Sequence, residues 1–74
     1  MDLYKDKFNK LLGKKIQTIR ENRELSQEKF AEITGTSRSY VGEIERGEKS
    51  ITVYKLYKML HHLDISLKEF FEKL

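Results

Sequence analysis

The sequence contains no cysteine and no proline. Without cysteine, a disulfide, a thiolate metal cluster and a cysteine nucleophile are all excluded, and the chain fits a reducing compartment, so we expect it in the cytoplasm. No apolar run approaches the roughly 20 residues that a membrane-spanning helix needs. The first residues also lack the apolar stretch of a signal peptide. We therefore expect neither a membrane anchor nor secretion.

Charge of one sign is only slightly in excess. Fifteen Lys and Arg stand against 12 Asp and Glu, which gives a net charge of +3 and an isoelectric point near 9.2. This balance suits a polyanionic partner, but many ordinary domains are equally basic. The 74 residues suffice for a single domain, residues 1–74, with one modest core. A domain this small, without disulfides or metal, needs tight helix packing or a partner subunit.

Apolar residues recur at helical spacing, and no segment alternates as a strand does. We predict an all-α domain with helices over residues 3–22, 26–35, 38–47, 52–63 and 66–73. Gly13 weakens the first helix by about 1 kcal/mol relative to alanine. The predicted apolar faces, in chain order, are Tyr4, Phe8, Leu12, Ile16 and Ile19; Phe30, Ala31 and Ile33; Tyr40, Val41 and Ile44; Leu56, Met59, Leu60 and Leu63; and Leu67, Phe70, Phe71 and Leu74.

Helix start and stop signals support these boundaries. Ser26 is a good N-cap, and Gly35 can end the same helix in the left-handed conformation. Ser66 with Glu69 three residues later forms a capping box. The signals therefore place the start of the second helix at Ser26 and a tight turn after it at Gly35.

The stretch from Gln27 to Gly47 has the residue types that two crossed helices with a tight turn require. Ala31 is small where the helices press together, and Gly35 adopts positive φ in the turn without steric cost. Val41 and Ile44 are the inward residues of the second helix. The combination predicts a helix-turn-helix over about residues 26–46, whose second helix enters the major groove of DNA.

The outward side of that second helix carries the candidate base-reading residues. Arg38 can bind guanine O6 and N7 with two hydrogen bonds, and Glu43 can accept one from cytosine N4. The predicted base-reading set is Ser37, Arg38, Ser39 and Glu43. The predicted contacts to the DNA backbone are Gln27, Tyr40, Arg46 and Lys49. We expect the Tyr40 ring to be partly packed, with its hydroxyl near the DNA backbone.

Residues 25–31 (LSQEKFA), Gly35 and residues 39–47 (SYVGEIERG) resemble the Cro/C1-type (XRE-type, lambda-repressor-like) helix-turn-helix family. Residues 51–52, 56, 63–65 and 69–71 are similar to the controller proteins of restriction-modification systems. The resemblance implies a five-helix domain that binds double-stranded DNA as a homodimer. It assigns base and backbone contacts to the residues named above, and it makes Arg20 and Glu45 a buried ion pair between the first and third helices. The sequence departs from the family at Gly42, where serine is commoner, and at Glu48, where a basic residue is more usual.

A single helix-turn-helix reads only a few base pairs, so a homodimer on an operator with two half-sites would supply the remaining specificity. We predict a dimerisation region over about residues 51–74. Its candidate interface residues are Ile51, Val53, Tyr54, Ile65, Leu67 and Phe71. A controller protein is the leading interpretation; the alternatives are an antitoxin whose main partner is a toxin, or a small phage or plasmid repressor. No nucleophile–base pattern indicates an enzyme, and we expect no metal, cofactor or small-molecule ligand.

Overall fold

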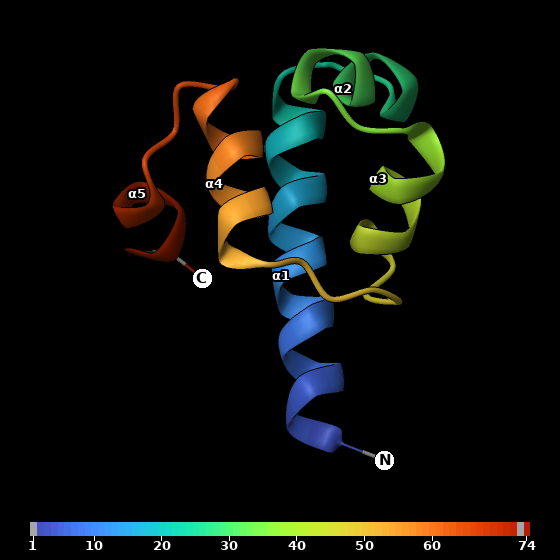
Figure 1. Cartoon of the computed structure of the whole chain (residues 1–74), viewed down its shortest axis with the longest axis vertical. Helices are drawn as coiled ribbons and strands as arrows, with labels where there is room; N and C mark the ends of the chain where they lie inside the picture. The colour runs from blue at the N-terminus through green and yellow to red at the C-terminus, as the bar shows by residue number, and fades with distance from the viewer. Residues whose placement is uncertain (1, 73) are drawn as a thin grey trace.

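The computed structural model describes residues 2–72 and 74. These residues form α1 (Leu3–Asn22), α2 (Gln27–Thr34), α3 (Arg38–Glu45), α4 (Val53–His61) and α5 (Leu67–Glu72), with no strand among them. The helix α1 stands at the centre, with α2 and α3 against one side of its upper part and α4 and then α5 on the other (Figure 1). The all-α, five-helix fold is confirmed, and the observed helix bounds lie within two residues of the prediction. Residue 73, where the fifth helix was predicted to end, lies outside the described residues.

Each helix begins at a residue whose side chain accepts a hydrogen bond from the backbone N–H three residues later. These bonds satisfy N–H groups that have no partner inside the helix. The capping residues are Asp2, Ser26, Ser37, Thr52 and Ser66. The predicted caps at Ser26 and Ser66 are confirmed, and Glu69 completes the capping box by accepting from the Ser66 N–H at 3.1 Å.

Four helices are followed, within three residues of their last helical residue, by a residue in the left-handed conformation. Gly35 has φ 69° and Gly47 φ 74°, while Glu24 and Asp64 both have φ 57°. In each case the next N–H bonds back to a carbonyl five residues earlier, at 2.9 to 3.2 Å, as in a Schellman motif. The predicted turn at Gly35 is confirmed. The same geometry at Glu24 and Asp64 could not be predicted from the sequence, because residues with a Cβ rarely adopt it.

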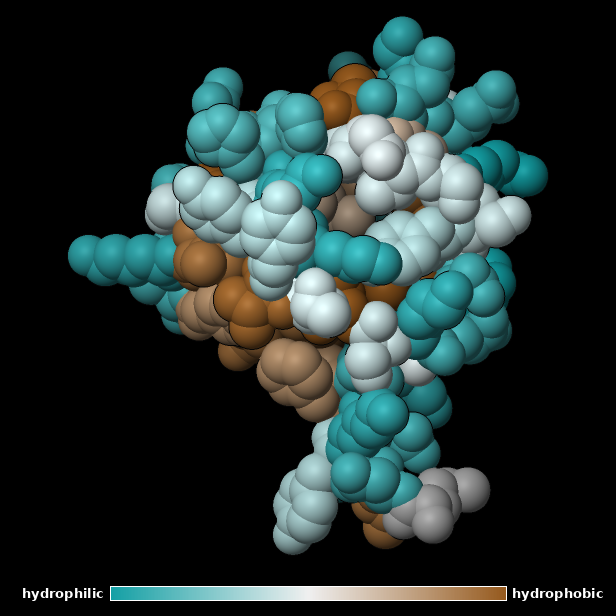
Figure 2. Space-filling model, in the orientation of Figure 1, coloured by the Kyte–Doolittle hydropathy of each residue, from teal (hydrophilic) through white to brown (hydrophobic). Residues whose placement is uncertain are grey.

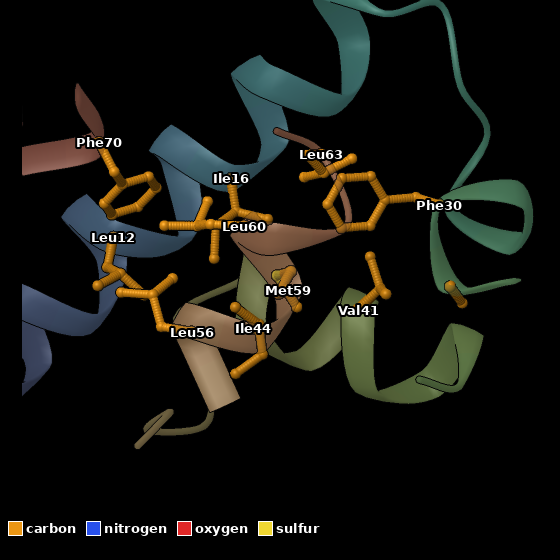
Figure 3. Packing of buried hydrophobic residues seen from close by; sticks show 11 residues of the cluster. Leu12, Ile16, Phe30, Val41, Ile44, Leu56, Met59, Leu60, Leu63 and Phe70 are labelled. Carbon is orange, nitrogen blue, oxygen red and sulfur yellow. The ribbon is translucent and has the colours of Figure 1, made fainter. Parts of the chain in front are cut away.

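One apolar core joins the five helices (Figure 3). Its buried members are Leu12, Ile16, Phe30, Ala31, Val41, Ile44, Leu56, Met59, Leu60, Leu63 and Phe70. Each helix contributes at least one of them, so no helix buries its apolar face without the others. None of the described helices has both the length and the apolar character needed to cross a membrane.

Four residues of the predicted apolar faces are exposed, and one of them is Phe71 of α5, which is 43% exposed. Tyr4 and Phe8 are 89% and 48% exposed, because the N-terminal half of α1 projects beyond the other helices (Figure 1). Ile33 is also exposed, and Thr34 is buried in the core instead, where its hydroxyl donates to the Phe30 carbonyl at 2.8 Å. A threonine can replace an apolar residue there because this hydrogen bond satisfies its polar atom.

Gly13 lies where α1 and α3 approach most closely. A Cβ on Gly13 would collide with the carbonyl oxygen of Ile44 and would lie 2.9 Å from that of Glu45. Because glycine has no side chain, the backbone of α1 can pack directly against the backbone at the end of α3. Sequence reasoning recognised only the local cost of this glycine to helix stability.

Candidate nucleic-acid interface

The helix α3 has one fully buried side and one open side. Val41 and Ile44 are completely buried against the core, and Ala31 of α2 is buried at the crossing of the two helices. This packing fixes the rotation of α3 about its own axis. Arg38 and Ser39 consequently lie exposed at its N-terminal end.

A shallow hollow of about 360 Å³ lies on this open side of α3. Three predicted base-reading residues and two predicted backbone contacts line it. Two of the three base-reading residues lie at the N-terminus of α3, and the third lies one turn further along the helix. The lining residues are Gln27, Arg38, Ser39, Gly42, Glu43 and Arg46. Ser37 and Tyr40 instead line a neighbouring hollow, against α4.

Glu45 holds the two helices of the motif to α1. Its carboxylate accepts from Nε and Nη2 of Arg20 at 2.7 and 3.1 Å, and from the Gln27 amide at 3.0 Å. The Glu45 side chain is only 3% exposed and that of Arg20 12%. The hydrogen bond to Glu45 raises the pKa of Arg20. Arg20 also donates to the Leu25 carbonyl at 2.8 Å, so one guanidinium fixes the start of α2 and the end of α3.

Gln27 lies at the first turn of α2 with one amide hydrogen donated to Glu45. An amide nitrogen carries two hydrogens, so one donor remains for a group outside the protein. The N-terminus of α2 adds the partial positive charge of its free N–H groups. The position therefore has the donors that bind a phosphate.

The two predicted cationic contacts beyond α3 are both paired with carboxylates. Arg46 donates to Glu48 through Nε at 2.8 Å and through Nη2 at 3.1 Å. This pairing raises the pKa of Arg46 and lowers that of Glu48, so both stay ionised at neutral pH. Lys49 Nζ lies 3.5 Å from the Glu43 carboxylate. Both pairs are exposed, so each cation remains accessible to an external anion.

Tyr40 packs toward α4. Its hydroxyl is buried and has no hydrogen-bond partner among the described residues, and burial raises its pKa. Lys49 and Lys55 lie 5.6 and 5.4 Å from the centre of its ring. The hydroxyl was expected near the DNA backbone, whereas the structure encloses it beside the second hollow, of about 290 Å³.

Sequence reasoning did not single out Lys55 and Lys58, which line the second hollow together with Tyr40. Only the spatial packing of α4 beside the turn brings them there. Their position on the exposed side of an amphipathic helix was the available signal, but exposed lysines are too common on such helices to identify a site.

The residues predicted for the dimer interface form two groups. Three are half-buried against the core of their own chain: Ile51, Ile65 and Leu67. Three are exposed: Val53 and Tyr54 at the start of α4, and Phe71 on α5. The second group therefore has more apolar surface available to contact another molecule.

The model of the HTH_3 helix-turn-helix family matches residues 16–70. The chain belongs to this family. As a family member, it is a helix-turn-helix transcription regulator, for which double-stranded DNA is the binding partner. Its relatives among the curated proteins are regulators rather than enzymes.

The relatives of this helix-turn-helix protein include proteins that are named as controllers. The control protein C.SmaI of Serratia marcescens is 33% identical over 60 residues, which is 81% of this chain and 71% of that protein. The crystal structure of the restriction-modification controller protein C.AhdI from Aeromonas hydrophila superposes with a TM-score of 0.81 at 33% identity, over 89% of this chain and 96% of that one.

Longer proteins contain the same domain. The HTH_3 family transcriptional regulator from Vibrio cholerae superposes with a TM-score of 0.85 at 33% identity, over 93% of this chain but only 39% of that one. The chain thus spans well under half of that regulator. The likeness to it concerns the helix-turn-helix domain alone.

Proposed function

We propose that the chain regulates transcription by binding a specific DNA sequence as a homodimer, with one α3 in each of two half-sites. The observation that carries this proposal is the division of α3 into a buried side and an open side. Because Val41 and Ile44 lock the helix to the core, Arg38 and Ser39 are presented outward on a rigid element. A rigid reading helix gives base contacts a fixed register.

Arg38 is the principal base-reading residue in this proposal. It is exposed at the first turn of α3, and its guanidinium can form two hydrogen bonds with guanine O6 and N7. Glu43 lies one turn further on and is suited to accept from cytosine N4. Its contact with Lys49 at 3.5 Å reduces the repulsion between this carboxylate and the phosphates.

The homodimer is supported by exposed apolar side chains on α4 and α5. Val53 is 69% exposed and Tyr54 68%, and Phe71 is exposed on the neighbouring helix. Figure 2 shows apolar surface where α5 packs beside α4. Aromatic residues of this kind are enriched at the centre of protein interfaces, so we assign the contact between protomers to this surface.

Within this class, we propose a restriction-modification controller. The support is the similarity to C.SmaI and to C.AhdI, the latter over 96% of its length. A chain of this kind would bind operators beside its own gene. Genes for a DNA methyltransferase and an endonuclease next to its own gene are the expected context, whereas a neighbouring toxin gene would favour the antitoxin interpretation.

Selection of bound duplexes from random DNA tests the proposed function. We expect a recovered consensus with two related half-sites whose centres are about one helical turn apart, roughly 10 base pairs. Sedimentation at micromolar concentration should show a dimer, alone and on the selected duplex. Recovery of no consensus would reject sequence-specific binding, and a monomer bound to one half-site would reject the homodimer.

A further inference from the structure

The turn after α3 is fixed from two sides. Gly47 has φ 74°, and the N–H of Glu48 donates to the Glu43 carbonyl at 2.9 Å, which folds the chain back against the end of the helix. Gly47 also abuts α1, since a Cβ there would lie 2.9 Å from the Cα of Lys10. The backbone of Glu48 is therefore held beside the last turn of α3.

From this position Glu48 holds the Arg46 guanidinium by two of its three nitrogens. The distances are 2.8 Å from Nε to Oε2 and 3.1 Å from Nη2 to Oε1. A planar guanidinium held at two nitrogens by a carboxylate has one defined orientation. Nη1 is left at the opposite edge.

The free edge of Arg46 lies over Gly42. A Cβ on Gly42 would be 3.0 Å from Nη1 of Arg46, closer than an undisturbed neighbour allows. Both residues line the hollow that contains Arg38. Gly42 and Glu48 therefore both lie beside the same guanidinium. Gly42 gives it room, and Glu48 orients it.

We propose that Glu48 is a positioning residue for DNA binding, which holds Arg46 over Gly42 so that Nη1 binds a phosphate at the edge of the half-site. The inference rests on the proposed function. An unpaired arginine side chain loses rotamer freedom when it binds, which costs free energy. The carboxylate of Glu48 already restricts the Arg46 side chain before binding, so this cost is smaller. Charge alone would have the opposite effect, because a carboxylate near phosphates repels DNA.

The two roles predict opposite signs for Glu48→Gln, measured on a duplex selected by the wild-type chain. If Glu48 positions Arg46, the substitution weakens binding about three- to tenfold. If Glu48 acts only through its charge, binding tightens. Glu32→Gln, which makes the same change of charge at an exposed site on α2 outside the hollow, is the matched control.

Repeating Glu48→Gln in an Arg46→Ala background tests whether the effect passes through Arg46. Without the guanidinium only the repulsion remains, so the same substitution should now leave binding unchanged or tighten it. A double-mutant cycle of this kind isolates the coupling between the two residues. Equal weakening in both backgrounds, or tightening in both, would overturn the proposal.

Gly42→Ala separates positioning from folding. Alanine in the interior of α3 should raise the melting temperature by a few degrees, roughly 3–8 °C. Its Cβ displaces Nη1, so binding to the selected duplex should weaken although the protein is more stable. Unchanged or tighter binding would contradict the placement of Arg46. If the wild-type chain selects no duplex at all, the proposed function fails before this inference is reached.

Discussion

Glu45 shows how a charged residue on α3 can stabilise the fold. Its carboxylate is almost inaccessible and receives two hydrogen bonds from Arg20 and one from Gln27. Its helical neighbour Arg46 points to the surface instead and pairs with Glu48. Adjacent residues on a helix face different directions, so neighbouring charged side chains can have different roles.

Removing one partner of the buried pair should unfold part of the population. We expect Arg20→Ala to lower the free energy of unfolding by about 3–5 kcal/mol, because Glu45 would keep a buried charge with fewer partners. Urea denaturation followed by circular dichroism measures the change. A decrease in the free energy of unfolding of less than about 1 kcal/mol would mean that water replaces the guanidinium. Arg20 would then not be important for the stability of the fold.

Arg38 should behave in the opposite way. Its side chain is exposed, so Arg38→Ala should leave the urea midpoint unchanged while weakening binding to the selected duplex by about 1–3 kcal/mol at constant salt. The preference for one base pair of the half-site should also relax. Equal weakening on all DNA sequences would show that Arg38 contacts only phosphate.

At the scale of the helices, periodicity and capping signals sufficed to predict the fold. The bounds of α1 and the caps at Ser26 and Ser66 follow from local rules that act within a few residues. The exposure of Tyr4 and Phe8 could not be predicted this way. An apolar stripe does not show where its partner helices end, and α1 is longer than the core it packs against.

Gly13 gives the sharpest test of helix-to-helix contact. Helix propensity alone predicts that Gly13→Ala stabilises the protein by about 1 kcal/mol. The carbonyl oxygens of Ile44 and Glu45 leave no space for the new methyl group. We therefore expect the substitution to lower the free energy of unfolding by about 1–3 kcal/mol. Thermal unfolding shows whether the substitution stabilises or destabilises the protein. A higher melting temperature would refute the close approach of α1 and α3.

The capping box at the start of α5 should make the stability of the protein depend on pH. Hydrogen bonds from the backbone and side chain of Ser66 lower the pKa of Glu69 below its ordinary value of 4.5. A carboxyl group with a lowered pKa in the folded state stabilises that state above its unfolded pKa, and this contribution is lost as the pH falls through the folded value. Wild type should therefore melt above Glu69→Gln at pH 7, and the difference should disappear as the pH falls through the lowered pKa of Glu69. A difference that persists in acid would contradict the charged capping box.

For the whole molecule, the sequence identified the open side of α3 but left the surroundings of Tyr40 undetermined. The offsets of Ala31, Gly35 and Val41 determine how the two helices cross, so the exposure of Arg38 and Ser39 could be inferred. The second hollow depends on where α4 returns beside the turn. That placement follows from the assembled core, which no local pattern describes.

The proposed dimer makes a prediction at this scale. Tyr54 is 68% exposed, so Tyr54→Asp should preserve the fold while placing a charge in the contact between protomers. Sedimentation should then show a monomer at concentrations where the wild type is a dimer, with melting temperature nearly unchanged. If the variant remains dimeric, the interface between protomers does not include the start of α4. Lys68→Ala, on the exposed part of α5, controls for a general surface effect.

The separation of α3 into a locked side and an open side has a practical consequence. Positions 38, 39 and 43 can be randomised together without touching the residues that anchor the helix, because Val41 and Ile44 point the other way. A library built on this small chain would therefore vary its DNA preference on a constant scaffold. New recognition sequences could then be obtained by exchanging a few surface side chains, with no redesign of the interior.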